Sequence, residues 1–519
     1  MGAVIGLHRH RGSELAGSSV SHLFSRLQAA VEREHEVRPR PWHWRHLPEA
    51  RRREVTARWM AECDLVIAPD DVALEARRAA GLDVPVVSFP LGSLPRGDSA
   101  VRRQLPLLRS QDVIACTSEA DLAILRLLYD SCAAAQALLP LGVETRAFRP
   151  PSPEEREEVR RSLGIRRQEV LFLSLGRITA EKSVHEVLEL FATVVRRHPR
   201  ARLAIAGPFA DLPFEEFGTG PFDLRVVFDQ ILAARPEVRA RTLLLGNVLP
   251  ANAPSLYGAA DVFINLTRHH DENFGYAQVE AMACGLPVIG TDWGGLKDTI
   301  RHGETGWKVP TWVTGRGIQI DLFRAFRHCD ALIRSPALRR RMGEAGRAVA
   351  EAEYSAERFE RSVLELVARA LDAPRGRPSR TALSAFGRRF SRAFGGRRPV
   401  PARFTTPGTY PLYQELILPY ATGPVEPRPA PDGAVLFSTP LSCALEGDRL
   451  TVEDVVWPVE LRLSDAERAL LVWYRRQAPR RGRFIPVGEA RRALPGRRFD
   501  QTLAALVRKG ILLTSPDRA

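Results

Sequence analysis

Short apolar runs that alternate with helical segments dominate the first 370 or so residues of the chain. Runs such as Val84–Phe89 and Asp112–Cys116 are rich in β-branched residues and contain almost no polar alternation. Strands of this kind are typical of parallel sheets that are buried on both faces. The segments between them, such as Val184–His198, carry apolar residues at helical spacing. This alternation predicts an α/β fold with doubly wound parallel sheets.

The alternation occurs in two blocks, separated by the turn-rich sequence LLPLGVETRAFRPPSPEE at 138–155. A chain of 519 residues is also long for one core. We therefore expect a first domain over residues 1–150 and a second over residues 151–372. The expected strands are 4–7, 63–68, 84–89 and 112–116 in the first block, and 170–175, 202–206, 242–245, 261–266 and 287–290 in the second.

Residues 373–400 are strongly basic, with eight arginines and no acidic residue. Leu383, Phe386, Phe390 and Phe394 recur there at helical spacing. A basic amphipathic helix can lie on an anionic membrane surface or meet a lipid-linked acceptor. The same pattern also fits a helix that packs its aromatic side chains on a neighbouring domain, or a disordered linker.

The remaining residues divide into a basic and proline-rich linker, 373–460, and a small domain, 461–519. Ser464 and Glu467 form a predicted capping box before an apolar helix. Two more helices are predicted over Val487–Leu494 and Asp500–Lys509, before the strand ILLT, so the region resembles a winged helix. DNA contact and protein contact both remain open for it. The candidates for phosphate contact are Arg491, Arg492, Arg497 and Arg498.

Composition narrows the class of partner and the compartment. The net charge of +14 favours anionic partners, although a simple arginine bias explains it equally well. No run of about 18 apolar residues is present, so no spanning helix is expected. The six cysteines are scattered without a CxxC pair. These features predict a cytoplasmic protein with reduced thiols, which could be peripheral at the inner face of the membrane.

Glycines and cations follow several of the predicted strands. Gly176-Arg177 directly follows strand 170–175, and Lys182 comes soon after. Asn247 follows strand 242–245, and Gly294-Gly295 follows strand 287–290. The carboxyl ends of parallel strands form the ligand-binding edge of an open α/β sheet. Two cations beside helix N-termini predict a site for a multiply charged phosphate.

Two carboxylates accompany this edge. Glu272 precedes Phe274-Gly275, and Glu280 lies in the predicted helix that follows. A helix rises about 1.5 Å per residue, which places Glu280 within reach of groups beside the phosphate. Carboxylates accept hydrogen bonds from hydroxyls, so a ligand with ribose and sugar hydroxyls fits both residues. The combination predicts a sugar nucleotide.

Three motifs together resemble the family-four retaining glycosyltransferases of the GT-B fold. They are the spacing Glu272-x7-Glu280, the GR…EK pattern over 176–182, and the sequence GLPVIGTDWGGLKDTIRHGETGWKVP over 285–310. The resemblance covers about residues 165–370, is weaker over 1–150 and is absent after about 373. It implies two Rossmann-like domains that face each other across a cleft, with the nucleotide sugar bound mainly by the second.

The resemblance also implies residue roles. Arg177, Lys182 and the glycine amides would contact the diphosphate, Glu280 the ribose and Glu272 the donor sugar. No metal or cofactor is implied, because cations and helix dipoles neutralise the leaving group. The implied reaction transfers a hexosyl group from a nucleotide-diphosphate sugar to an unknown acceptor with retention of configuration.

The first block departs from the family pattern in two places. The family's glycine-rich first loop has only Gly17-Ser18-Ser19 as its nearest counterpart, and Ser88-Phe89-Pro90 stands where many members carry a histidine. A second hypothesis therefore stays open, in which the chain binds a nucleotide sugar without turnover and acts as a regulatory or scaffold protein. The C-terminal domain would then contact DNA or a protein.

Overall fold

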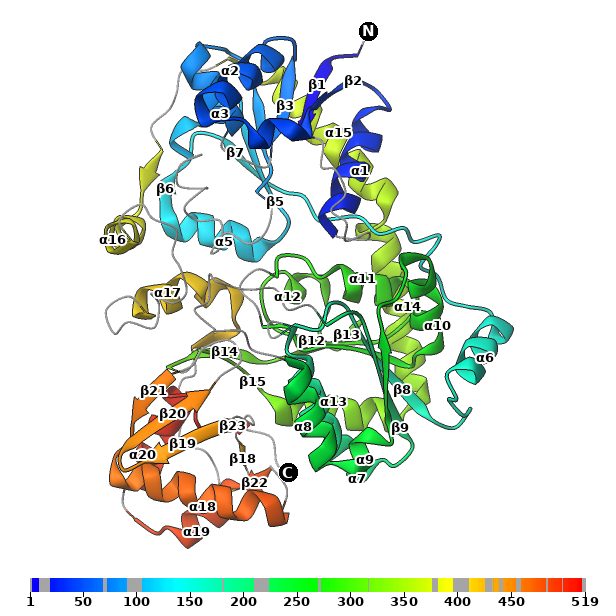
Figure 1. The fold of residues 1–519 in the computed structure, drawn as a ribbon, viewed down its shortest axis with the longest axis vertical. Helices are drawn as coiled ribbons and strands as arrows, with labels where there is room; N and C mark the ends of the chain where they lie inside the picture. Colours follow the sequence, from blue (N-terminus) through cyan, green and yellow to red (C-terminus); the bar gives the residue numbers. More distant parts are fainter. Residues whose placement is uncertain are drawn as a thin grey trace. The chain divides into compact units, whose positions relative to one another are not determined.

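In the computed structural model, most of the chain folds into helices and strands that form two compact units (Figure 1). Unit 1 comprises residues 1–148, 270–280 and 348–399, and unit 2 comprises residues 149–269, 281–347 and 400–519. The described residues are 2–8, 19–68, 72–90, 105–179, 182–209, 224–268, 272–315, 317–375, 381–394, 410–424, 432, 434–437, 442–453, 459–481, 484–496 and 498–515.

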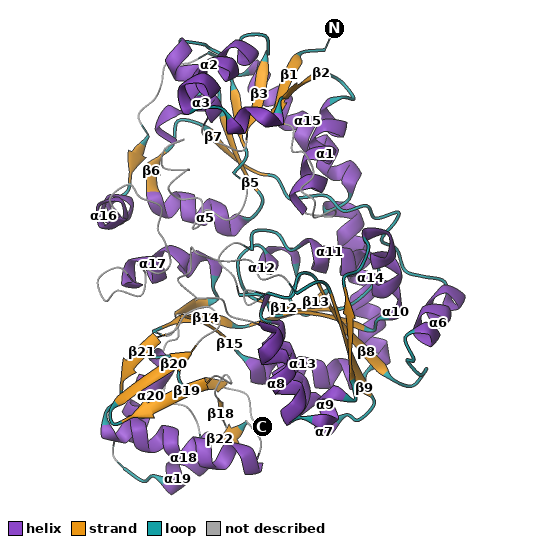
Figure 2. Ribbon diagram, viewed as in Figure 1, coloured by secondary structure: helices purple, strands orange, loops and turns teal. Residues whose placement is uncertain are grey.

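Unit 1 is built on a six-stranded sheet in the order β2-β1-β3-β4-β5-β7, with all neighbouring pairs parallel (Figure 2). Every residue of β3, β4 and β5 is buried, as expected for a sheet covered on both faces. The strands are β1 (Val4–His8), β2 (Glu36–Arg40), β3 (Leu65–Ala68), β4 (Val86–Ser88), β5 (Val113–Cys116) and β7 (Ala135–Leu138). The four strands predicted for this block are confirmed, whereas β2 and β7 were not predicted.

The helices of unit 1 include one from far along the chain. Residue Val143 donates its N–H to Tyr354 O at 2.7 Å, and Arg33 pairs with Glu360 at 3.0 Å. The last helix of the second sequence block therefore returns to the first sheet, where it packs beside the first helix. The helices are α1 (Ser19–Val31), α2 (Glu49–Met60), α3 (Val72–Ala80), α5 (Glu119–Leu128) and α15 (Ala356–Asp372), with short 3-10 turns at η1 (Trp42–His46) and η2 (Leu105–Leu107).

Unit 2 contains a second parallel six-stranded sheet, in the order β10-β9-β8-β11-β12-β13. In chain order this is 3-2-1-4-5-6, so the direction of winding reverses between β8 and β11. The predicted doubly wound α/β fold is therefore confirmed. The strands are β8 (Val170–Leu175), β9 (Ala201–Ala206), β10 (Thr242–Gly246), β11 (Val262–Asn265), β12 (Val288–Thr291) and β13 (Gly306–Val309).

The core of unit 2 forms where amphipathic helices cover this sheet. The predicted stripe of α7 is buried, with Val187, Leu188, Phe191 and Val194 all in the core. Residues of α11 and α14 are shared between the two units. The helices are α6 (Pro153–Ser162), α7 (Val184–Arg197), α8 (Leu224–Ala234), α9 (Pro236–Arg239), α10 (Ala253–Ala259), α11 (Tyr276–Ala283), α12 (Leu296–Thr299), α13 (Leu322–Arg334) and α14 (Pro336–Glu353), with a short 3-10 turn at η5 (Pro250–Asn252).

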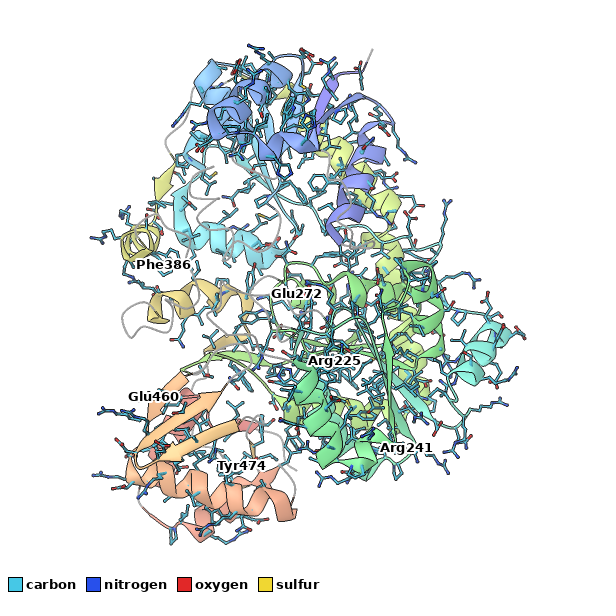
Figure 3. All side chains as sticks on the ribbon, viewed as in Figure 1. Arg225, Arg241, Glu272, Phe386, Glu460 and Tyr474 are labelled. Atoms are coloured by element: carbon cyan, nitrogen blue, oxygen red, sulfur yellow. The ribbon has the colours of Figure 1, made fainter. Side chains whose placement is uncertain are left out.

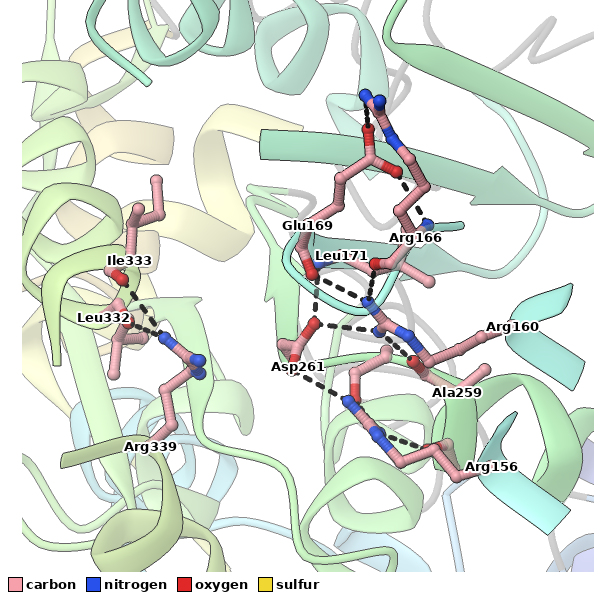
Figure 4. Close-up of polar contacts among 12 residues, drawn as sticks. Arg156, Arg160, Arg166, Glu169, Leu171, Ala259, Asp261, Leu332, Ile333 and Arg339 are labelled. Atoms are coloured by element: carbon pink, nitrogen blue, oxygen red, sulfur yellow. Dashed lines mark hydrogen bonds and ion pairs between the residues drawn. The ribbon is translucent and has the colours of Figure 1, made fainter. Parts of the chain in front are cut away.

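The amino edge of the second sheet is closed by an ion-pair cluster around Asp261 (Figure 4). Asp261 accepts the backbone N–H of Leu171, the second residue of β8, at 2.8 Å. Arg156 and Arg160 of α6 pair with the same carboxylate at 2.8 and 3.1 Å. Their guanidinium groups also donate to the carbonyls that end α10. The cluster fixes α6 to the sheet, on the edge opposite the strand carboxyl ends.

The basic segment after α15 packs on unit 1. β16 (Ala382–Leu383) pairs antiparallel with β6 (Tyr129–Ser131), and α16 (Ala385–Phe394) follows. Phe390 is fully buried and Phe386, labelled in Figure 3, is 8% exposed. Of the three alternatives for this segment, the structure therefore shows the helix that packs its aromatic side chains. Contact of this segment with an anionic membrane surface stays a prediction, and Arg388 and Arg389 are exposed.

The C-terminal region forms two small antiparallel sheets and three helices. The sheet β22-β18-β23 joins the core of unit 2 through Val435, Phe437 and Leu513, and Phe484 packs on Phe323 of α13. The predicted capping box is present, because Ser464 N donates to Glu467 Oε2 at 2.7 Å. The elements are β18 (Val435–Phe437), β19 (Ser442–Glu446), β20 (Arg449–Glu453), β21 (Val459–Arg462), α18 (Asp465–Arg481), β22 (Ile485–Pro486), α19 (Val487–Ala493), α20 (Phe499–Arg508) and β23 (Leu513–Ser515).

The winged-helix resemblance stays a prediction. One of its phosphate candidates has other partners, because Arg491 pairs with Asp432 at 2.8 Å and with Asp500 at 2.7 Å. Arg497 lies outside the described residues. Among the helices that the structure describes, none is long and apolar enough to cross a bilayer.

Candidate functional site

The candidate site lies at the carboxyl edge of the unit 2 sheet. Gly176-Arg177 follows β8, and Arg268 follows β11, so these residues flank the point where the winding reverses. Ligands of open α/β sheets bind in the crevice at this point. The expectation that the glycines and cations share one edge of one sheet is met by the topology.

The loop after β8 is anchored on both sides of Arg177. Gly176 N donates to Ala206 O at 2.9 Å, and Ile178 N donates to Pro208 O at 2.8 Å. Gly207 has φ +143°, and a Cβ atom there would lie 1.8 Å from Gly176 O, so only glycine permits this approach. The buried neighbours hold the loop, while Arg177 itself is exposed.

Lys182 stands at the entry to α7. Its backbone N–H donates to Thr179 O at 3.2 Å, and the side chain is half-buried. The next residue, Ser183, has φ +51°, a left-handed conformation that is uncommon for a residue other than glycine. α7 is a helix of 14 residues, so its first amides add to the positive potential around Lys182.

A buried ion pair that the sequence analysis did not single out connects two parts of this edge. Arg268 Nη2 lies 2.8 Å from Glu186 Oε1, and both side chains are almost fully buried. Arg268 Nη1 also donates to Ile318 O at 2.7 Å. The pair joins the end of β11 to the first turn of α7. The sequence signal that could have pointed to this ion pair is an arginine soon after a buried strand, at the same edge of the sheet as Arg177.

Asn247 and the strand before it lie further from the reversal point. β10 is the outer strand of the sheet, two positions away from β8. Asn247 is exposed there. Gly207 N donates to Gly246 O, so the loops after β9 and β10 are connected.

The segment that carries the two glutamates is counted with unit 1. Thr117 Oγ1, just after β5, donates to Asn273 O at 3.0 Å. The Phe274 ring is buried and makes edge contacts with Tyr276 and Tyr354. Phe274 therefore fixes this segment by packing. Gly275, with φ +88°, makes the turn into α11.

Glu272, labelled in Figure 3, and Glu280 are both half-buried. Tyr276 lies between these two glutamates in the sequence. Burial raises the pKa of its phenol, so the phenol stays protonated at neutral pH. His269 and His270, which precede Glu272 in the chain, lie outside the described residues, as do Gly17 and Ser18.

The Gly294-Gly295 turn differs from the expected helix N-terminus. α12 is only four residues long, and Gly295 has ordinary right-handed geometry. Gly294 N already donates to Tyr420 O at 2.8 Å. The turn is therefore held by the C-terminal part of the chain, which the sequence did not indicate.

The edge as a whole suits a polyanion. Arg177 and Lys182 supply cationic groups, and the glycine turns bring the backbone close to any ligand at the reversal point. Residues 155–349 match the family model described as glycosyl transferases group 1. The chain resembles that family over these residues, which we call the group 1 region.

Curated relatives of the group 1 region match it in part only. D-inositol 3-phosphate glycosyltransferase of Corynebacterium jeikeium is 28% identical over 222 residues, which is 42% of this chain and 51% of that protein. Mannosylfructose-phosphate synthase of Agrobacterium fabrum is 28% identical over 211 residues, 39% of this chain and 43% of that protein. Alpha-monoglucosyldiacylglycerol synthase of Streptococcus pneumoniae is 32% identical over 154 residues, 29% of this chain and 31% of that protein. The chain spans about half the length of these relatives or less.

Solved structures extend the likeness beyond the group 1 region. HepE of Anabaena, crystallised with UDP, superposes with a TM-score of 0.55 at 17% identity, covering 70% of this chain and 99% of that one. Sucrose-phosphate synthase of Thermosynechococcus elongatus gives a TM-score of 0.54 at 19% identity, covering 72% and 100%. The two parallel sheets are thus those of the GT-B fold, as the resemblance implied.

Proposed function

We propose that this protein transfers a hexosyl group from a nucleotide-diphosphate sugar to an acceptor, with retention of configuration. The observation that carries the proposal is the position of Arg177 and Lys182 in a group 1 region, at the carboxyl edge of a sheet whose winding reverses beside them. A diphosphate at that edge would meet two cations and the N-terminus of α7.

In this proposal the cations act on the leaving group. Arg177 and Lys182 stabilise the negative charge that develops on the nucleotide diphosphate as the glycosidic bond breaks. The amide of Gly275 is the backbone donor at the turn into α11. Glu280 accepts hydrogen bonds from the ribose hydroxyls, and Glu272 orients the donor sugar.

The remaining predicted contacts take narrower roles. Asn247 contacts the donor from the end of the outer strand. The Gly294-Gly295 turn contributes to donor binding through the backbone of Gly295 and through the shape of the turn. Phe274 supports the Glu272 segment from within unit 1 by its buried ring.

The acceptor side belongs to unit 1 in this proposal. The exposed Arg388 and Arg389 of α16 give unit 1 a basic surface that fits the headgroups of an anionic lipid bilayer. A relative of the group 1 region is named for the synthesis of a glucosyl lipid. We infer a lipid-linked or membrane-held acceptor, met through charged side chains and without insertion of the α16 aromatics.

The experiment is donor hydrolysis by the purified full-length protein. UDP- and GDP-sugars are supplied in turn, and release of the nucleotide diphosphate is measured. One donor should be hydrolysed slowly, with the rate sharply reduced in Lys182→Ala and Glu272→Ala. Tight binding of a donor without release, across a broad acceptor panel, would instead support the non-catalytic sensor.

The partner classes are separated by a binding titration. Full-length protein is mixed with liposomes containing anionic lipid, with neutral liposomes and with duplex DNA at increasing salt. Binding to the anionic liposomes alone, weakened by salt and by Arg388→Ala with Arg389→Ala, is the expected result. Salt-sensitive binding to DNA would instead support the hypothesis that the C-terminal domain binds nucleic acid.

A further inference from the structure

The turn after β12 is in contact with a segment more than 100 residues later in the chain. This segment, residues 418–424, contains the 3-10 turn η7 (Leu418–Tyr420) and the strand β17 (Gly423–Pro424). It follows α17 (Tyr410–Ile417) and lies wholly in unit 2, as does the turn itself. We call residues 292–297 the glycine turn and residues 418–424 the strap.

The centre of the contact is buried. Trp293 and Tyr420 are both fully buried, and their rings meet edge-on with centroids 5.7 Å apart. Edge-to-face aromatic pairs of this geometry stabilise a structure beyond the burial of their rings. Gly294 N donates to Tyr420 O beside these rings. A buried aromatic contact of this kind is typical of the stable parts of a structure, which open least often.

Polar contacts extend the strap along the whole glycine turn. The Lys297 ammonium donates to Pro419 O. Burial lowers the pKa of Lys297, in keeping with its enclosed position. The Thr422 hydroxyl donates to Asp292 Oδ2 at 2.8 Å and accepts from Thr311 N at 3.2 Å. Each end of the turn therefore has its own bond to the strap.

The strap is itself anchored in the sheet β15-β14-β17. β17 pairs in parallel with β14 (Thr311–Thr314), which forms a hairpin with β15 (Gly317–Ile320). Gly315, in the bend of this hairpin, donates its N–H to Arg508 O of α20. On the other side, Ile318 O accepts from Arg268, which pairs with Glu186 of α7. The C-terminal region thus contacts the glycine turn directly and the hairpin β14-β15, and the hairpin in turn contacts the ion pair that supports α7.

We propose that the strap is part of the donor site and that Tyr420 is a positioning residue for it. Tyr420 orders the glycine turn, so the conformation that accepts the nucleotide diphosphate depends on a residue outside the group 1 region. This inference rests on the proposed function, because it assigns the strap to the same ligand. It also means that the region after residue 400 is no separate module added to a complete enzyme.

The test compares two buried tyrosines of the C-terminal region in the full-length protein. Tyr420→Ala removes the ring against Trp293, whereas Tyr474→Ala removes a ring that is 4% exposed in a different hydrophobic cluster. UDP and GDP binding is measured by calorimetry below the unfolding temperature of both variants. We expect about a tenfold rise in Kd for Tyr420→Ala and less than about twofold for Tyr474→Ala, a difference of about 1 kcal/mol or more.

A milder variant keeps the test decisive if Tyr420→Ala does not fold. Thr422→Val preserves the shape of the side chain but removes its bonds to Asp292 and Thr311 N, so a smaller rise in Kd is expected. Unchanged nucleotide affinity in both strap variants would overturn the proposal, as would an equal loss in Tyr474→Ala.

Amide exchange separates this inference from the proposed function. The amide of Gly294 should exchange faster in Tyr420→Ala than in the wild type, with no nucleotide present. If the wild type binds neither UDP nor GDP, the proposed function fails and the donor-site role of the strap fails with it. Faster exchange without any change in Kd would leave the strap as a support of the fold alone, and the positioning role would be wrong.

Discussion

The two six-stranded sheets are alike at their amino edges. In each, an aspartate stands directly before a buried strand and accepts the N–H of a neighbouring strand. Asp64 accepts from Val4 at 2.7 Å and Asp112 from Val86 at 2.8 Å in unit 1, and Asp261 accepts from Leu171 at 2.8 Å in unit 2. The sequences DLVI, DVIA and DVFI mark these three positions.

The carboxyl edges differ. In unit 2, Gly176-Arg177, Lys182 and Arg268 give this edge glycine turns and cationic side chains. In unit 1, the described residues at the carboxyl ends of β4 and β5 are uncharged, with Ser88, Thr117 and Ser118 all buried. Among the described residues, the two sheets therefore share the part that stabilises a fold and differ in the part that can bind an anion. This difference supports the proposal that the diphosphate binds to unit 2.

The largest expected effect is at the shared amino edge. Asp112 and Arg77 form a bidentate pair at 2.7 Å, with both side chains almost fully buried. Asp112→Ala leaves the arginine charge buried without its partner, which costs about 3–5 kcal/mol. Urea unfolding should show this loss. The exposed pair of Arg58 and Glu54 is the control, and Glu54→Ala should leave the free energy of unfolding almost unchanged.

The same experiment at Asp261 sharpens the comparison. Its side chain is 14% exposed and has two arginine partners, so Asp261→Ala should cost about 1.5–3 kcal/mol. A negligible cost at both aspartates would show that the amino edges are not the common structural element.

The second effect concerns the carboxyl edge that differs between the sheets. Lys182→Ala removes a charge-assisted contact to phosphate, so the Kd of the nucleotide diphosphate should rise about 10- to 100-fold. Arg200→Ala, at the exposed amino end of β9, removes the same charge from the opposite edge and should leave the Kd unchanged. Equal losses in the two variants would mean that net charge, and not the edge, determines binding.

The third expected effect is a loss of stability in acid that originates in unit 2. His328 of α13 stacks on Trp307 at 4.6 Å, and burial lowers its pKa to about 3. The unfolded state therefore takes up a proton near pH 6.5 while the folded state does not, so stability is lost as the pH falls from about 6.5 towards 3. The loss at pH 5 should be about 2 kcal/mol.

His328→Phe is the matched variant for this measurement. It keeps an aromatic ring against Trp307 but cannot titrate, so the slope of unfolding free energy against pH should flatten between pH 6.5 and 5. An unchanged slope would place the acid sensitivity elsewhere in the chain.

The smallest expected effect is at Thr117, whose hydroxyl lies at the carboxyl edge of the unit 1 sheet and contacts the segment that carries Glu272. Thr117→Val removes the bond to Asn273 O but keeps the shape of the side chain, at a cost of about 1 kcal/mol. Because Asn273 adjoins Glu272, kcat for donor hydrolysis should fall several-fold while the Kd for UDP or GDP stays constant. A change in Kd alone would place this contact with the diphosphate instead of the sugar.

Sequence patterns recovered the buried strands because each is a short β-branched run. They missed β2, whose sequence EVRPR has almost no apolar residue, and the hairpin strands β14 and β15. β2 pairs with β1, about 30 residues earlier, and β14 also pairs with β17, more than 100 residues later. At the candidate site, spacing predicted Arg177, Lys182 and the glycines. It could not identify the partners of Arg268 or Gly294, because Glu186 and Tyr420 reach them only through tertiary contacts.

The discontinuity of unit 1 has a consequence for how the protein is made. The chain passes between the units five times, after residues 148, 269, 280, 347 and 399. The unit 1 sheet is complete at Leu138, but α15, which buries Phe359 and Val363 beside it, is synthesised about 220 residues later. At ordinary translation speed that delay is roughly 10–40 s. During this interval the nascent sheet lacks the helix that covers part of its apolar face, and the exposed surface increases the risk of misfolding and aggregation.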